Sequence, residues 1–276
     1  MSRGTRGGVR AALARWRGRD IELKTLAEID AMRVAGGLVA RTLAGVAGAA
    51  RPGVSTAELD ALAEQVIRDG GGVPSFLGYH DYPASICTSV NEQIVHGIPS
   101  PTQVLVDGDL LSVDCGAIVE GWHGDAAVTV AVGTGTPADV SLSVACERAL
   151  HAGIAAVRAG GRLTDVSHAV QSAAEDAGRR DGVTYGVVRE YGGHGIGTSM
   201  HMDPFLPNHG APGQGPRLVP GMALAVEPML TAGDAETREL DDGWTVVTAD
   251  GRRAAHWEHT VAVTDVGPRI LTLPLD

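Results

Sequence analysis

The sequence is poor in aromatic residues and contains no long apolar run. Its 276 residues include only 2 Phe, 4 Trp and 4 Tyr, so aliphatic side chains and alanine must fill the core. There is no stretch of the kind that forms the apolar region of a signal peptide, and no run long enough to cross a bilayer. We therefore expect no membrane association. Hydrophobic residues make up 44% and charged residues 20%, which excludes bulk disorder.

Cysteine and positive charge are also scarce. The three cysteines, Cys87, Cys115 and Cys146, show no CxxC spacing, which favours a reducing, cytoplasmic compartment. The net charge of −11 argues against a phosphate-binding surface, so we expect no DNA partner. The chain also lacks a GxSxG elbow, a Walker loop and a strand-borne GxGxxG motif, which excludes the mechanisms that depend on them.

Residues 1–20 depart from this acidic character, because they hold six Arg and one Asp. We expect a flexible, solvated basic extension over 1–20, followed by one domain over 21–276 that acts as a monomer. The alternative for the extension is a tether to an anionic partner such as ribosomal RNA.

Periodicity predicts helices over 26–50, 56–69, 137–158 and 164–178. Ser55 and Glu58 form the capping box of the second helix. Two β-rich runs, 110–119 and 123–132, predict a hairpin that turns at 119–121. We expect residues 73–100 to be irregular around one short strand, residues 185–215 to be mostly loop, and the chain to close with strands.

The second half of the chain repeats the first. Asp114 follows a Leu-Val pair and a glycine at the same offsets as Glu227, and Asp125 and Glu258 each lie two residues after a histidine and three before a Val-x-Val segment. This pattern indicates a duplication that places two acids at equivalent strand positions in each half.

These acids indicate a metal site. Asp114 and Asp125 flank the predicted turn, which makes them cross-strand neighbours on one face. For one hairpin alone, exposure to solvent or pairing with Arg explains the two acids equally well. In two related hairpins, however, four carboxylates converge in apolar strands where Lys and Arg are scarce, and divalent cations supply the missing counter-charge.

Histidines extend the candidate site. His194 lies between glycines in GGHGIG and adds a nitrogen ligand, which completes a set suited to two metal ions. His96 and His201 are candidates for acid–base or hydrogen-bonding roles. The other histidines are expected to be exposed or paired elsewhere; side-chain alternation turns His259 away from the metal face, whereas the facing of His123 and His256 stays open.

The motifs NEQIVHGIP, VDCGAIVEGWHGDAAVTVAVG, GGHGIG, MHMDP, LAVEPM, DDGWTVVT and HWEHTVAV occur in this order, at 91–99, 113–133, 192–197, 200–204, 224–229, 241–248 and 256–263. The chain resembles the type I methionine aminopeptidases, a branch of the pita-bread metallopeptidases, from Lys24 to Thr272. The resemblance implies an α/β (α+β) pita-bread fold, in which two pseudo-twofold helix-helix-hairpin halves surround a curved antiparallel sheet with helices on its outer side.

The resemblance also implies an activity: removal of the initiator methionine from nascent chains and N-terminal Met peptides with a small second residue, by metal-activated water attack at a dinuclear site. It implies two divalent metal ions (Co, Mn, Fe or Zn) held by Asp114, Asp125, His194, Glu227 and Glu258, with Asp125 and Glu258 bridging. Glu227 would handle the proton, and His96 and His201 would contact the substrate. The methionine pocket would comprise Tyr79, Phe76, Tyr82, Cys87, Phe205 and Trp244.

One position departs from the family pattern. Ala126 follows Asp125 where many relatives carry Thr, so we expect a modest change in metal affinity from a missing hydroxyl. Three alternatives stay open: a proline-directed aminopeptidase or dipeptidase on the same fold, a binding module that has lost catalysis, and a metal-stabilised structural protein. The proline-directed enzymes usually carry an extra N-terminal domain, whereas about 20 residues precede the first helix here. Intact ligands and histidines argue against the other two.

Overall fold

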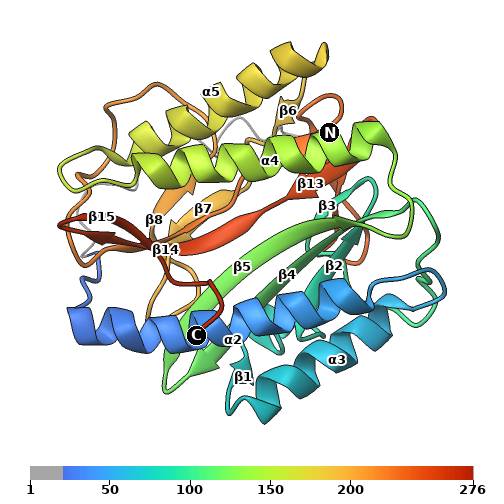
Figure 1. Ribbon diagram of the computed structural model, residues 1–276, viewed down its shortest axis with the longest axis horizontal. Coiled ribbons are helices and arrows are strands. Elements are labelled where there is room, and N and C mark those ends of the chain that lie inside the picture. Colours follow the sequence, from blue (N-terminus) through green and yellow to red (C-terminus); the bar gives the residue numbers. More distant parts are fainter. Residues whose placement is uncertain (1–20, 276) are drawn as a thin grey trace, which may run out of the picture.

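A computed structural model describes residues 21–275 (Figure 1). The expected basic extension over 1–20 lies outside the described residues. Along the described part, no helix combines the length and the apolar character that crossing a bilayer requires.

Two capped helices open the first half. α2 (Leu26–Ala49) begins with a capping box between Thr25 and Glu28, and α3 (Thr56–Asp69) begins with the one predicted between Ser55 and Glu58. In each box the side-chain hydroxyl of the cap residue accepts a hydrogen bond from the backbone N–H of the glutamate. The glutamate carboxylate in turn accepts one from the backbone N–H of the cap residue. The predicted positions of both helices are confirmed.

Two further helices open the second half. α4 (Pro137–Ala156) is capped by the Thr136 hydroxyl and has its proline at the first position, where no N–H is needed. α5 (Leu163–Asp181) runs three residues beyond the predicted end and stops at Gly182, whose φ of 70° is left-handed.

The predicted hairpin is formed by β4 (Leu110–Val119) and β5 (Trp122–Ala131). Its tight turn is Glu120–Gly121, with φ of 50° and 84°, as a two-residue hairpin turn requires. This turn falls within the predicted 119–121. Asp114 lies opposite Ala127 and Asp125 lies opposite Gly116, so the two acids are diagonal neighbours on one face, as predicted.

A nine-stranded sheet joins the halves in the order β1-β4-β5-β14-β9-β7-β8, with β2 paired to β4 and β15 to β14. The two halves meet where β5 pairs antiparallel with β14, placing Glu258 opposite Ala127. Its remaining strands are β1 (Val73–Pro74), β2 (Ile86–Val90), β7 (Gly192–Gly195), β8 (Met202–Pro207), β9 (Ala223–Val226), β14 (Glu258–Thr264) and β15 (Gly267–Ile270).

The segment around His194 is a strand and not the predicted loop. β7 pairs with β9, with His194 opposite Ala225, and with β8 on its other side. The glycines of β7 allow its neighbouring strands to approach closely. A Cβ atom on Gly193 would lie 2.2 Å from the carbonyl oxygen of Ala225, and a Cβ atom on Gly195 would lie 2.2 Å from the carbonyl oxygen of Asp203. The glycines therefore let β7 pair closely on both sides, which holds the His194 imidazole in a fixed position on the sheet.

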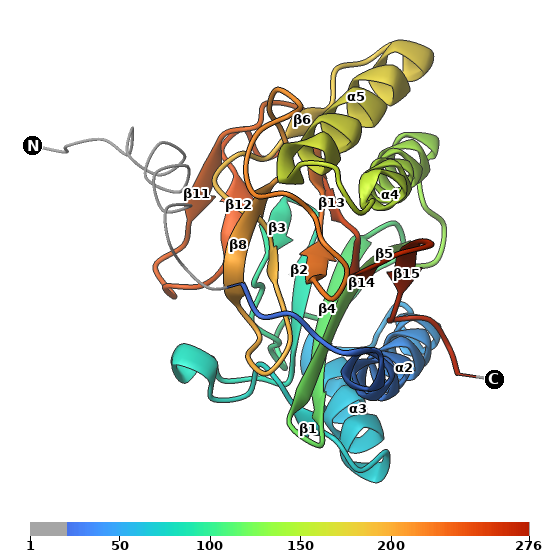
Figure 2. The same cartoon turned by 90° about the vertical axis from the view of Figure 1, so that its left-hand side faces the viewer.

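Two three-stranded sheets flank the main one. The first has the order β13-β10-β6 and the second β11-β12-β3. Figure 2 shows the four helices toward one side of the main sheet and β11 and β12 toward the other. The strands of these two sheets are β13 (Ala254–His256), β10 (Met229–Thr231), β6 (Gly186–Val187), β11 (Thr237–Glu239), β12 (Val246–Thr248) and β3 (Gln93–Val95). A short 3-10 helix, η1 (Tyr79–Asp81), lies between β1 and β2 in the chain.

An aliphatic core lies between the helices and the sheet in each half. In the first half, Leu38 and Leu43 of α2 pack with Val113 and Cys115 of β4. In the second half, Leu150 and Leu163 pack with strand residues from β9 and β14. Because alternate residues of β4 and β5 face this core, Asp114 and Asp125 project from the opposite face.

Glycines of α2 allow contrasting tests of this packing. A Cβ on Gly36 would lie 2.3 Å from the Leu271 carbonyl oxygen, whereas one on Gly45 would meet nothing within 4 Å. We expect Gly36→Ala to destabilise the protein by about 1–3 kcal/mol through overpacking. Gly45→Ala should stabilise it by about 0.5–1 kcal/mol through helix propensity. Urea unfolding measures both, and equal effects of the two variants would contradict this packing.

Candidate metal centre

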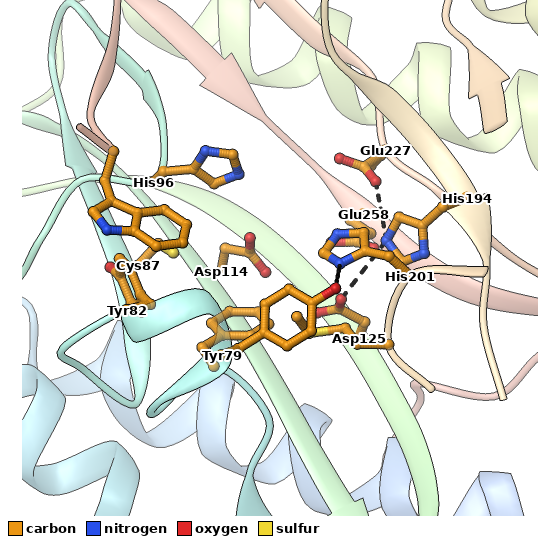
Figure 3. Close-up of a pocket in the computed structure, with 13 residues that line it drawn as sticks. Tyr79, Tyr82, Cys87, His96, Asp114, Asp125, His194, His201, Glu227 and Glu258 are labelled. Atoms are coloured by element: carbon orange, nitrogen blue, oxygen red, sulfur yellow. Dashed lines mark hydrogen bonds and ion pairs between the residues drawn. The ribbon is translucent and has the colours of Figure 1, made fainter. Parts of the chain in front are cut away.

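All five predicted ligands line one cavity on the sheet face turned away from the helices (Figure 3). Each comes from the neighbourhood of a different strand: Asp114 from β4, Asp125 from β5, His194 from β7, Glu227 from the end of β9 and Glu258 from the start of β14. The rigid sheet thus brings together residues up to 144 positions apart in the chain.

The ligand atoms are close enough to share an ion. Nε2 of His194 lies 3.4 Å from Oε1 of Glu227 and 4.0 Å from Oδ2 of Asp125. One ligand atom each from Asp125, His194 and Glu258 lie within 4.8 Å of one another. These three residues are 4%, 6% and 2% exposed, so their charges have little help from water.

Three of the four carboxylates each have one oxygen without a partner. Oδ1 of Asp114, Oδ1 of Asp125 and Oε1 of Glu258 are buried without a hydrogen-bond partner among the described residues. No Lys or Arg is among the described residues that line the cavity. Unpaired buried charges are costly, and oxygen-rich sets with one imidazole are what divalent cations bind. The donor set therefore fits divalent metal.

The titration of these groups reflects the same burial. Burial raises the pKa of Asp114 to about 7 and, together with the neighbouring carboxylates, raises the pKa values of Asp125, Glu227 and Glu258 well above the usual range. Burial lowers the pKa of His194 to about 3, which keeps its imidazole neutral and able to donate a lone pair.

Two threonine hydroxyls tie the halves together at this site. The Thr260 hydroxyl accepts from the Asp125 N–H at 3.0 Å and donates to the Asp125 carbonyl at 2.8 Å. The Thr129 hydroxyl makes the same pair of bonds with the backbone of His256, at 2.9 Å and 2.7 Å. Each bond pair fixes a site strand against a strand of the other half.

Both non-ligand histidines lie beside the carboxylates. The rings of His201 and His194 have centroids 4.2 Å apart, and Nδ1 of His201 lies 3.0 Å from the Tyr79 hydroxyl. His96 contacts Trp244 edge-to-face with centroids 6.3 Å apart. Burial lowers the pKa of both His96 and His201 to about 4, so both rings are neutral at pH 7.

Most of the predicted pocket residues surround the same cavity. These are Phe76, Tyr79, Tyr82, Cys87 and Trp244. Phe205 instead lines an adjoining cavity, which also contacts His96, His201 and Glu227. Met200 lines the main cavity and was missed, although it stands directly before His201 in a motif already singled out.

His256 is the other residue that sequence reasoning did not place. Its side chain is buried, and its Nε2 lies 3.8 Å from Oε2 of Glu227 without a hydrogen-bond partner among residues 21–275. The two carboxylate oxygens of Glu227 thus face two histidines, His194 and His256. The spacing of two residues before Glu258 was the available signal.

Three other positions are not predicted ligands. His123 lies on the same face of β5 as Asp125 and is close enough to His194 to contribute to the lowered pKa of its imidazole. His123 bonds the Ser75 hydroxyl, and His259 bonds Thr272 on the helix-covered side, as alternation predicts. Ala126 packs in the core cluster of the first half, on the face opposite Asp125. A threonine hydroxyl there would point away from the ligand carboxylates, so the expected effect of Ala126 on metal affinity loses its physical basis.

Buried acids grouped around a neutral imidazole indicate a metal site, and comparison with known proteins identifies the class as a metallopeptidase. The model of metallopeptidase family M24 matches residues 30–265. The methionine aminopeptidase 1 of Mycobacterium tuberculosis is 60% identical over 95% of this chain and 98% of its own length. The chain belongs to the M24 metallopeptidases and, within them, to the methionine aminopeptidase family.

Solved structures show the same pita-bread fold. Methionine aminopeptidase from Thermotoga maritima superposes with a TM-score of 0.88 at 41% identity, over 92% of this chain and 100% of that chain. An Xaa-Pro dipeptidase from Bacillus anthracis has a TM-score of 0.71 at 23% identity, over 91% of this chain and 61% of that chain. The second likeness shows the fold alone.

Carboxylate crowding predicts how the stability of the metal-free protein depends on pH. Above pH 8 the histidines of the unfolded chain are almost entirely neutral, as are the buried histidines of the site, whereas the raised carboxyl pKa values mean that the native state holds protons that the unfolded state has released. The free energy of unfolding should therefore fall as pH rises from 8 to 9.

Urea unfolding of chelator-treated protein at pH 8, 8.5 and 9 measures this effect. Asp125→Asn should flatten the dependence because it removes one of the crowded charges. Stability that rises with pH in the metal-free wild type would contradict the account.

Proposed function

We propose that the protein is a methionine aminopeptidase that removes the initiator methionine from N-terminal Met peptides with a small second residue. The observation that carries this proposal is the convergence of Asp114, Asp125, His194, Glu227 and Glu258 beside an aromatic cavity. The relatives at 60% and 41% identity bear the name methionine aminopeptidase and support it.

We propose that the five residues hold two divalent ions, drawn from Co, Mn, Fe and Zn. Charge supports this number, because four carboxylates and a neutral imidazole are balanced by two divalent cations. Bound metal would lower the pKa of a coordinated water and polarise the peptide carbonyl. Asp125 and Glu258, which lie on the neighbouring strands β5 and β14 at the seam between the halves, are the proposed shared ligands.

The chain's own residues have distinct roles in the proposal. Glu227 accepts the proton of the attacking water and delivers it to the leaving amine. His201, as a neutral N–H donor, hydrogen-bonds the carbonyl oxygen as negative charge develops on it. His96, on the other side of the cavity, holds the substrate's peptide unit.

The cavity beyond the carboxylates suits a methionine side chain. Cys87 and Met200 offer polarisable sulfur, and Tyr82 and Trp244 close the wall with ring centroids 5.0 Å apart. The Tyr82 hydroxyl is fixed by bonds to the Ile86 and Gly97 carbonyls, so it presents its ring to the cavity. We assign Phe205 to the adjoining cavity, where the residue after methionine would lie.

We also propose a cytoplasmic enzyme that works as a monomer on nascent chains. Cys87, Cys115 and Cys146 are buried free thiols, which suits a reducing compartment. The described site is lined from one chain, so a monomer suffices. Ribosome association through the basic residues 1–20 is a further proposal, and salt-dependent ribosome binding that is unchanged in a protein lacking 1–20 would refute it.

Peptide choice tests the function. With metal-stripped protein and added Mn(II), Co(II) or Fe(II), we expect methionine release from Met-Ala-Ser and no cutting of Ala-Pro-Ala. Cutting of Ala-Pro-Ala alone would assign the chain to the proline-directed relatives. No hydrolysis with any metal would favour a binding module.

Substitution tests the roles. Glu227→Ala should abolish methionine release, and His201→Ala should lower kcat by about 10²- to 10³-fold, the loss typical of one oxyanion donor. Gly45→Ala serves as a control with unchanged kcat. Full activity of Glu227→Ala would refute the site assignment.

A further inference from the structure

The Tyr79 hydroxyl makes a contact that the methionine pocket does not require. It lies 3.0 Å from Nδ1 of His201, with ring centroids 5.3 Å apart (Figure 3). This is a well-formed hydrogen bond by distance. Among residues 21–275, His201 is the only recorded hydrogen-bond partner of this hydroxyl.

The backbone holds Tyr79 firmly in this position. Tyr79 begins the short helix η1, and its N–H donates to the Phe76 carbonyl while its own carbonyl accepts from Tyr82. Gly78 also donates to the Tyr82 carbonyl, which closes the turn. His80 and Asp81, with φ of 48° and 69°, adopt left-handed conformations, which persist only where surrounding contacts enforce them.

This bond determines which nitrogen of His201 carries the proton. A neutral imidazole has one N–H, and the partner of one nitrogen fixes the state of the other. A phenol that donates to Nδ1 leaves the ring proton on Nε2, whereas a phenol that accepts from Nδ1 leaves Nε2 without one. A donor to the substrate carbonyl needs the first of these tautomers, since Nδ1 is already occupied by Tyr79.

We propose that Tyr79 is a positioning residue that holds His201 in the Nε2–H tautomer and in a fixed ring orientation, in addition to lining the methionine pocket. This inference rests on the proposed function of His201 as a donor to the substrate. Tyr79 acts through His201 and need not touch the reacting atoms.

Tyr79→Phe tests the proposal, because it removes the hydroxyl and keeps the ring. We expect kcat for Met-Ala-Ser to fall about 3- to 10-fold, the value of one hydrogen bond, with KM within about twofold. In a His201→Ala background the same substitution should have no further effect on kcat. Equal losses in both backgrounds, or a rise in KM alone, would overturn the proposal.

A second measurement does not depend on turnover. Long-range ¹H–¹⁵N spectra of the metal-free protein, with His201 assigned by its absence in His201→Asn, should show an acceptor Nδ1 and a protonated Nε2. In Tyr79→Phe the two tautomers should mix. Tyr82→Phe should leave His201 unchanged, because the Tyr82 hydroxyl bonds the Ile86 and Gly97 carbonyls and the Cys87 thiol and not His201.

An unchanged His201 spectrum in Tyr79→Phe would refute the inference even if the enzyme is active. Loss of methionine release by the wild type together with the expected spectra would instead refute the proposed function alone.

Discussion

Electrostatic repulsion among buried carboxylates is the constraint on which this structure depends. Asp114, Asp125, Glu227 and Glu258 converge where neither water nor a described basic side chain balances them. A chain tolerates this arrangement only if rigid elements enforce it and bound protons or cations offset the charge. The central sheet supplies the rigidity, and Thr260, bonded twice to the backbone of Asp125, fixes the seam between the two halves.

The histidines around this centre can bind metal or form hydrogen bonds with substrate because they are uncharged. Burial lowers the pKa of His194, His96 and His201 far enough that each keeps a lone pair and one N–H at neutral pH. Within the proposed function, one of these rings serves as a ligand and two as hydrogen-bond partners of the substrate. The Tyr79 hydroxyl then determines the tautomer of the ring closest to the ligand histidine.

Much of this could be predicted from sequence, because a duplication repeats its signals. The capping box of Ser55 and the pairing of acids across the hairpin are local or near-local patterns, and they were confirmed. The strand at 192–195 was missed because its pairing with β9 is non-local and glycine patterns resemble loops. His256 was left open because its orientation depends on the change of sheet between β13 and β14.

The most direct test of the central claim is to count the bound ions. Native mass spectrometry of metal-stripped protein titrated with Mn(II), followed by thermal unfolding of the same samples, measures both counter-charge and stability. The account predicts up to two ions per chain and a Tm that rises with occupancy, with both effects lost in Glu258→Gln. If metal-stripped wild-type protein binds no added Mn(II) and its Tm does not rise, the claim that divalent cations balance the buried acids is contradicted.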